Sequence, residues 1–247
     1  MTSYETLAPV YDALTADVDH EAFAAFYEKA FSLAKVPVRT VLDLACGTGK
    51  VTKLLADRGY EMIGADASPD MLAIAMDKCA DCAVRPLFLN QTMQELDLYG
   101  TVEACVCALD GFNYVPPEDM PEVLHRLHLF IQPGGILVFD INSAYKLRGL
   151  DGGVFVDEAD TVYSVMRTEF DEEENALFYG LDLFTKNGRH WVRSAEEHLE
   201  YLYTVTQLRS LLKNAGFTDV RTYSGADFGP VKKTDQRLFF TAVRKNQ

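Results

Sequence analysis

Basic residues are few in this sequence of 247 residues, and they form no run. The 23 lysines and arginines are outnumbered by 37 aspartates and glutamates, which gives a formal net charge of -14. Because broad binding to a nucleic-acid backbone relies on clustered lysine and arginine, nucleic acid is disfavoured as a partner. Contact with one local feature of an RNA stays open, but we expect a small-molecule substrate.

Long apolar segments are also missing. No stretch approaches the roughly 20 apolar residues that a membrane-spanning helix needs. The start of the chain, MTSYETLAPVYDALTADVDH, lacks a basic segment followed by an apolar run, so no signal peptide is expected. The sequence therefore predicts a cytoplasmic protein without membrane contacts.

Cysteine is scarce and shows no framework spacing. The five cysteines are odd in number and fall mostly in segments expected to be buried, which favours reduced thiols over disulfides. Cys79 and Cys82 form a single CxxC, but no second pair or nearby histidine completes a zinc site. No metal is expected.

What the sequence does contain is a regular alternation of strand and helix patterns that begins near Arg39. Short apolar segments predicted as strands are RTVLDL, EMIGAD, RPLFLN, VEACVCAL and ILVFDI. Predicted helices are KVTKLLADRG, SPDMLAIAMDKCA and PEDMPEVLHRLHLFI, and a later helix, VTQLRSLLKNAG, precedes two closing strands. Apolar strands alternating with helices predict an α/β fold whose parallel sheet is covered by helices on both faces.

The pattern changes in two places. Residues 1–35 read as helical, and period-two runs without helix signals extend from about Val154 to Tyr203. The acidic turn DEEEN and the Asn-Gly pair of KNGR separate these runs, and Asn-Gly between alternating strands is a strong hairpin signal. We expect a main domain of residues 1–142 and 204–247, with residues 1–35 as a helical lid. Residues 143–203 are expected to form an inserted antiparallel β meander that caps the substrate.

The stretch VLDLACGTGK, residues 41–50, has the composition of a ligand-binding turn. An acid ends an apolar strand, and the glycines that follow let backbone approach a ligand closely. The dinucleotide fingerprint G-x-G-x-x-G would align with Ala45, Gly47 and Lys50, of which one is glycine. The phosphate-binding P-loop pattern is absent, since no Ser or Thr follows Lys50.

The stretch resembles the first motif of class I S-adenosylmethionine-dependent methyltransferases, seen here as DLACGTG. Asp66 ends the next strand, 23 residues after Asp43, and NQTMQELDL, ALDGFNY and IQPGGILVFD follow in the family's order. The resemblance covers about residues 39–141 and resumes near Thr204. It implies a Rossmann-like seven-stranded sheet and S-adenosyl-L-methionine as the cofactor.

The resemblance also implies which residues contact the cofactor. Asp66 would take the two ribose hydroxyls, Asp43 would orient the loop or the cofactor's amine, and the small residues of the loop would hold the methionine portion. Thr92 stands where many relatives carry aspartate, which leaves the adenine amino group to Gln91 or water, and both side chains could instead fix the loop. The full set implied is Tyr11, Asp43, Ala45, Cys46, Gly47, Thr48, Gly49, Asp66, Ala67, Met71, Gln91, Thr92, Met93 and Leu109.

The acceptor side resembles the bacterial YqeM-like small-molecule methyltransferases in the segments LAPVYDAL, FDINSAYKL and EEHLEYLYT. The resemblance implies that Tyr11 closes over the cofactor. It places near the acceptor the residues Asp110, Asn113, Tyr114, Asn142, Tyr145, His198, Tyr201 and Tyr203.

His198 and Tyr11 are the candidate catalytic residues. His198 is a candidate general base because its unperturbed pKa lies near neutrality, and the alternative is a histidine half exposed on a sheet face. In a regular strand Tyr201 and Tyr203 share one face and His198 lies on the other, so all three converge only if a bulge intervenes.

The expected function is methyl transfer from S-adenosylmethionine to a nitrogen, oxygen or carbon of a small molecule by in-line displacement, which yields S-adenosylhomocysteine. Two other functions stay open. One is a regulatory protein that binds the cofactor without transfer. The other is an NAD-dependent oxidoreductase, which conflicts with Lys50 at the third glycine position and with the closing pair of strands. Monomer and homodimer are equally open.

Overall fold

Two β-sheets organise the chain. The computed structural model describes residues 4, 6–225 and 227–245. The larger sheet contains β1 (Thr40–Leu44), β2 (Glu61–Asp66), β3 (Leu87–Asn90), β4 (Val102–Cys107), β5 (Ile131–Asn142), β10 (Phe217–Tyr223) and β11 (Arg237–Arg244). The smaller sheet contains β6 (Val154–Ala159), β7 (Val162–Asp171), β8 (Ala176–Asn187) and β9 (His190–Tyr201).

The helices lie mostly between strands of the larger sheet, as the alternation predicts. They are α1 (Ala8–Leu14), α2 (His20–Phe31), α3 (Lys50–Asp57), α4 (Pro69–Lys78), the short 3₁₀ helix η1 (Gly111–Tyr114), α5 (Met120–Phe130), α6 (Ala144–Gly149) and α7 (Val205–Asn214). The start of α4 follows the predicted signal, because Ser68 caps it by accepting from Met71 N and Pro69 occupies its first turn.

The larger sheet has the strand order β10-β11-β5-β4-β1-β2-β3. The strands from β1 to β5 pair in parallel, whereas β11 is antiparallel to both β5 and β10. The order reverses between β1 and β4, so a crevice opens there at the carboxyl ends of the strands. The predicted seven-stranded Rossmann-like sheet is confirmed.

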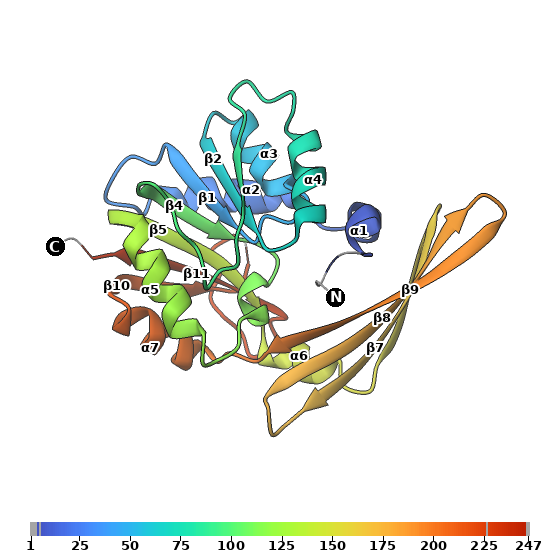
Figure 1. Cartoon of the computed structure of the whole chain (residues 1–247). Helices are drawn as coiled ribbons and strands as arrows, with labels where there is room; N and C mark the ends of the chain where they lie inside the picture. Colours follow the sequence, from blue (N-terminus) through green and yellow to red (C-terminus); the bar gives the residue numbers. More distant parts are fainter. Residues whose placement is uncertain (1–3, 5, 226, 246–247) are drawn as a thin grey trace.

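Apolar side chains cover both faces of this sheet. On one face α5 and α7 pack against it through a cluster that includes Leu124 and Leu208. On the other face α2 and α3 pack through a cluster that includes Phe26 and Leu55. Figure 1 shows these helices on either side of the central strands. The apolar face of α2 therefore belongs to the core of the main sheet.

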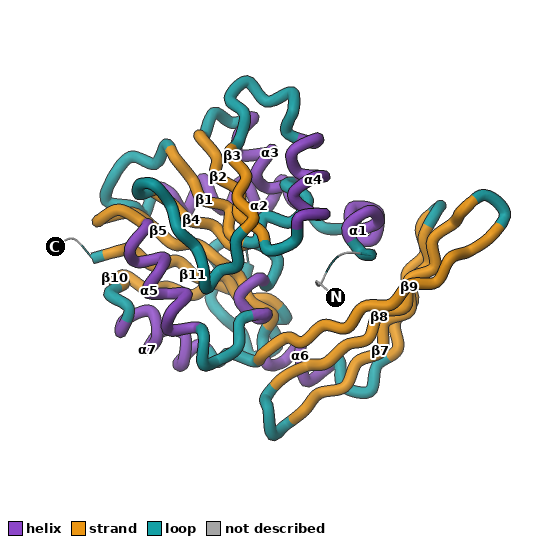
Figure 2. The backbone as a smooth tube through the Cα atoms, in the orientation of Figure 1, coloured by secondary structure: helices purple, strands orange, loops and turns teal. Residues whose placement is uncertain are grey.

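The smaller sheet is the predicted antiparallel meander, in the order β6-β7-β8-β9. The predicted Asn-Gly hairpin joins β8 to β9, with Asn187 paired to His190 and Gly188 at φ +61°. Figure 2 shows the meander as an elongated ribbon beside the main sheet. The helix α1 contacts α4 on one side and β6 and β7 on the other, so it bridges the two sheets.

Within the residues that the structure describes, no helix has the length and apolar character required to cross a membrane. All five cysteines are buried and free. The same part of the chain holds no group of three or more His, Cys, Asp or Glu residues arranged to bind a metal ion.

Candidate active site

A cavity of about 390 Å³ opens at the carboxyl ends of the parallel strands, where the strand order reverses. Apart from Gly49, every residue expected to contact a cofactor lines it. These residues are Tyr11, Asp43, Ala45, Cys46, Gly47, Thr48, Asp66, Ala67, Met71, Gln91, Thr92, Met93 and Leu109. Tyr4, which was not predicted from the sequence, also lines this cavity.

The loop between β1 and α3 presents backbone to the cavity. Gly47 adopts φ +53°, and a Cβ there would meet open space within 4 Å. Gly49 adopts φ +74°, and a Cβ there would lie 2.8 Å from the Ala75 side chain of α4. Gly49 is therefore needed for the loop to pack on α4, whereas Gly47 leaves room beside the cavity.

Asp43 is the penultimate residue of β1 and is only 1 % exposed. Its Oδ2 accepts from Thr52 Oγ1 at 2.5 Å, while its Oδ1 has no hydrogen-bond partner among the described residues. Burial raises the pKa of Asp43 to about 7. A buried acceptor in the wall of the cavity is suited to an N–H donor of a ligand.

Asp66 ends β2 and ties the loop to the next helix. Its Oδ2 accepts from Gly47 N at 2.8 Å and its Oδ1 accepts from Ser68 N at 2.8 Å. Burial raises the pKa of this carboxyl as well. Each oxygen retains a second lone pair, so the carboxylate can accept two further hydrogen bonds from the cavity side.

Gln91 and Thr92 use their side chains within their own loop. Gln91 accepts from Asp97 N at 3.1 Å and donates to Asp97 O at 3.3 Å. Thr92 donates to a Glu95 carboxylate oxygen at 2.9 Å and accepts from Glu95 N at 3.2 Å. Both side chains thus fix the loop, which is the alternative that the sequence left open, and the loop lines the cavity beside Met93.

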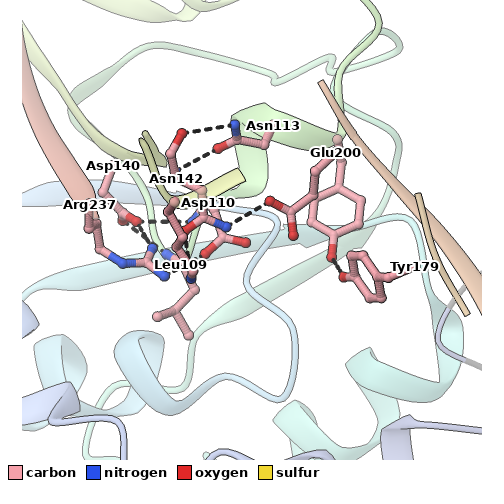
Figure 3. A network of polar contacts seen from close by, with 10 residues as sticks. Leu109, Asp110, Asn113, Asp140, Asn142, Tyr179, Glu200 and Arg237 are labelled. Carbon is pink, nitrogen blue, oxygen red and sulfur yellow. Dashed lines mark hydrogen bonds and ion pairs between the residues drawn. The ribbon is translucent and has the colours of Figure 1, made fainter. Parts of the chain in front are cut away.

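A buried ion cluster borders the cavity below η1. Asp140 on β5 accepts from Leu109 N at 2.9 Å and Asp110 N at 3.0 Å, and it pairs with Arg237 of β11. Arg237 also pairs with Asp110 at 2.7 Å. Figure 3 shows Arg237 reaching both carboxylates. Of the three charged side chains, only Asp110 was predicted from the sequence.

Asn113 and Asn142 join this cluster to β9, as Figure 3 shows. Asn142 N donates to Asn113 Oδ1 at 2.9 Å, and Asn142 Nδ2 donates to Glu200 Oε2 at 2.7 Å. Lys146 Nζ donates to Asn142 Oδ1 at 2.9 Å, which fixes the orientation of the Asn142 amide. Glu200 was missed, although Glu196, His198 and Glu200 follow each other at every second position, a spacing that places them on one strand face.

His198 is buried between aromatic rings instead of half exposed. It stacks on Tyr179 with ring centroids 4.9 Å apart, and Tyr4 lies 4.9 Å away on another side. Its Nε2 lies 3.3 Å from a Glu196 carboxylate oxygen, yet neither ring nitrogen makes a well-oriented hydrogen bond within the described residues. The ring centroid of Tyr114 lies 6.1 Å from that of His198, and the Tyr114 hydroxyl contacts the Tyr179 hydroxyl.

Three of the residues expected near the acceptor do not share the face of β9 that carries His198 and Glu200. The pairing of β9 with β8 shows no bulge, so Tyr201 points away from the face that carries His198 and Glu200. Tyr203 is buried in the main core and donates to Val115 O at 2.7 Å. Tyr145 lies on α6 and is exposed.

The N-terminal segment, described at Tyr4 and over residues 6–14, lines the cavity through Tyr4 and Tyr11 and is held at two points. Glu196 on β9 accepts from the backbone N–H groups of Tyr4, Thr6 and Leu7 at 3.0, 2.7 and 2.8 Å. Near the other end, the ion pair between Asp12 and Lys78 at 2.6 Å holds α1 to α4. Among the described residues of the expected lid, Tyr4 and Tyr11 of this segment and His20 at the start of α2 line the cavity.

Replacing Glu196 with alanine should loosen the N-terminal segment. Burial alone would raise the pKa of Glu196. The nearby His198 ring, the Thr6 hydroxyl and backbone N–H groups outweigh burial and lower this pKa from 4.5 to about 2. A lowered pKa means that this carboxylate stabilises the folded segment above about pH 4.5 and loses that effect as the pH falls toward 2.

Hydrogen exchange of the amides of Thr6 and Leu7, corrected for intrinsic rates, measures this effect. Glu196→Ala should speed their exchange by about tenfold or more at pH 7. Glu197→Ala, an exposed neighbour on the other face of β9, is the matched control and should change nothing. Equal protection in both variants would show that Glu196 does not hold the segment.

Comparison with known proteins finds similarity along the whole chain. Residues 41–135 match the model of a methyltransferase domain family. The chain is 31 % identical to the protein named putative methyltransferase YqeM of Bacillus subtilis (strain 168), over 98 % of this chain and 97 % of that protein. It superposes on an S-adenosylmethionine-dependent methyltransferase from Clostridium acetobutylicum with a TM-score of 0.88 and 25 % identity, covering 99 % of this chain and 100 % of that one.

The fold is shared more widely. The S-adenosylmethionine-bound CalS10 from Micromonospora echinaspora, an amino pentose methyltransferase, superposes with a TM-score of 0.74 at 19 % identity, over 99 % of both chains.

Proposed function

The chain belongs to the S-adenosylmethionine-dependent methyltransferases, and on that premise we propose that it transfers a methyl group from S-adenosylmethionine to a small molecule bound beside the cavity. The observation that carries the proposal is the cavity itself, whose wall contains the residues that the family's motifs assign to the cofactor. The second product is S-adenosylhomocysteine.

The residues of the cavity fit the cofactor. Asp43 Oδ1 is a buried acceptor without a partner among the described residues, which suits the amino group of the methionine portion. The open space beside Gly47 gives that portion room against the backbone. Asp66 has two oxygens with spare lone pairs for the two ribose hydroxyls. The loop of Gln91, Thr92 and Met93 would border the adenine.

When bound, the cofactor supplies a methyl group already activated by its sulfonium. The chain's own residues then have to hold the acceptor in line and keep water out. Tyr11 and Tyr4 cover the cavity from the N-terminal segment, and Tyr114 borders it from η1. The rings of Tyr4 and Tyr11 lie 6.3 Å apart, and those of Tyr4 and Tyr114 lie 6.1 Å apart, so they form a continuous aromatic wall.

Methyl transfer can be tested with S-adenosylmethionine labelled in its methyl group. The protein is incubated with separate pools of alkylamines, alcohols, phenols and carbon acids, and S-adenosylhomocysteine and labelled product are measured. We expect one pool to raise S-adenosylhomocysteine formation well above the rate without acceptor. Asp66→Ala is the control and should abolish the increase. Firm cofactor binding with no transfer to any pool would contradict the proposal and favour a regulatory protein.

A further inference from the structure

The carboxylates beside the cavity outnumber the cations that face them. Asp110, Asp140 and Glu200 form one cluster with Arg237 and Lys146. Arg237 pairs with both aspartates, whereas Lys146 bonds the Asn142 amide. With all groups charged, three carboxylates face two cations, and Glu200 is only 6 % exposed. A buried charge without a counter-charge is costly, so this site favours a ligand that brings a positive charge.

Glu200 has an oxygen to spare for such a ligand. Asn142 Nδ2 donates to Oε2, and this is the only hydrogen bond that the Glu200 carboxylate makes with the described residues. Asn142 cannot turn its oxygen toward Glu200, because that oxygen accepts from Lys146 and the backbone of Asn142 is held by Asn113. Asn142 therefore acts as a positioning residue for one carboxylate oxygen and leaves Oε1 for the ligand.

Aromatic rings complete the surroundings of Glu200. Burial first, and then charges that include those of Glu200 and Asp110, raise the pKa of Tyr4, Tyr114 and Tyr179. The three hydroxyls therefore stay neutral, and those of Tyr114 and Tyr179 contact each other. Tyr4 and Tyr114 also line the cofactor cavity, so the cluster adjoins the place where a methyl group would be transferred. Carboxylates combined with aromatic rings favour an alkylammonium ion.

We propose that the methyl acceptor is an amine, bound as its ammonium ion between the carboxylates of Glu200 and Asp110 and the rings of Tyr4 and Tyr114. The inference rests on the proposed function and narrows its substrate class. A neutral alcohol would leave the excess negative charge in place, and an anionic acceptor would be repelled by it.

Glu200 also has a role for the proton of the ammonium ion. The nitrogen has no free electron pair until it loses a proton, and Glu200 takes that proton while the pair stays on nitrogen as the lone pair. The protonated carboxyl then releases the proton to solvent before the next acceptor binds. Burial, followed by the charge of Asp110, raises the pKa of Glu200 to about 7, closer to that of an amine than an ordinary carboxyl.

Binding of a simple probe tests the proposal without relying on turnover. With the protein saturated by S-adenosylhomocysteine, n-butylammonium chloride and 1-butanol are titrated separately and followed by NMR. Wild type should bind n-butylammonium at least about tenfold more tightly than 1-butanol. Glu200→Gln should lose that preference while binding 1-butanol like wild type. Glu197→Gln, exposed on the other face of β9, is the matched control.

The pH dependence gives a second readout. The charged and titratable groups around Glu200 are those of the cluster (Asp110, Asp140, Lys146 and Arg237) and the hydroxyls of Tyr4, Tyr114 and Tyr179, and Glu196 and His198 share its face of β9. Because the charged form of Glu200 is needed, n-butylammonium affinity should fall as the pH drops from 8 through about 7 to 5. The same titration on Glu200→Gln shows whether the pH dependence of n-butylammonium binding comes from Glu200 or from His198, two residues away on β9.

Calorimetry with S-adenosylhomocysteine distinguishes failure of the amine proposal from failure of the proposed function. Glu200→Gln should bind it as wild type does, because Glu200 does not line the cofactor cavity. If it does so and the n-butylammonium preference is absent in wild type or unchanged in the variant, the amine proposal is overturned and the proposed function stands. If wild type itself does not bind S-adenosylhomocysteine, the proposed function fails and the amine proposal falls with it.

Discussion

Replacing Asp66 with alanine should weaken S-adenosylmethionine binding by about a hundredfold or more. Two charge-assisted hydrogen bonds to ribose hydroxyls, at roughly 1.5–3 kcal/mol each, would account for a loss of about 10²–10⁴-fold. The variant also frees Gly47 N and Ser68 N, which Asp66 now bonds at 2.8 Å. The loop would then lose its tie to α4 and hold the methionine portion less firmly.

Calorimetric titration of the folded variant measures this loss. Asp70→Ala is the control. It removes an exposed acid from the first turn of α4 and should bind S-adenosylmethionine like wild type. Near-normal affinity of Asp66→Ala would contradict the assignment of Asp66 to the cofactor.

Replacing Arg237 with methionine should destabilise the protein by about 3–5 kcal/mol, the usual cost of removing one partner from a buried ion pair. Arg237 is the cation that pairs with both Asp110 and Asp140, and Asp140 is fully buried. Without it, two neighbouring carboxylates would remain without their counter-charge, and one of them is fully buried. One of them would have to take up a proton or the site would open.

Denaturant unfolding at pH 7 gives the free energy of unfolding for this comparison. Arg221→Met, on the exposed part of the neighbouring strand β10, is the control and should change stability little. Adding Asp110→Asn to Arg237→Met should recover part of the loss, because it removes one of the unpaired charges. An Arg237→Met variant as stable as wild type would show that the cluster tolerates its excess charge.

The cofactor side of the molecule could be predicted from the sequence because its signals are local. Asp43 and Asp66 lie at the carboxyl ends of apolar strands, Asp43 one residue before the last and Asp66 at the last, and the glycines that follow Asp43 belong to one short turn. Parallel strands bring their carboxyl ends together, so these separate local signals meet at one edge of the sheet. The closing pair of strands and the meander were likewise predictable from their periodicity.

The acceptor side could not be predicted in the same way, because its contacts join distant segments. Arg237 and Asp140 lie 97 residues apart, and Tyr4 meets Glu196 across 192 residues. Nothing in the sequence around Arg237 or around Glu196 indicates such a partner. The resemblance drew attention to Tyr201 and Tyr203, yet the regular pairing of β9 turns Glu200 and His198 toward the cluster.

The central claim is that the cavity after β1 binds S-adenosylmethionine, and calorimetric titration of wild-type protein tests it most directly. S-adenosylmethionine, S-adenosylhomocysteine and NAD are titrated in parallel at pH 7.5. The account predicts saturable binding of the first two, with dissociation constants on the order of micromolar, and no binding of NAD. Folded protein that binds NAD, or that binds neither adenosyl compound, would contradict it.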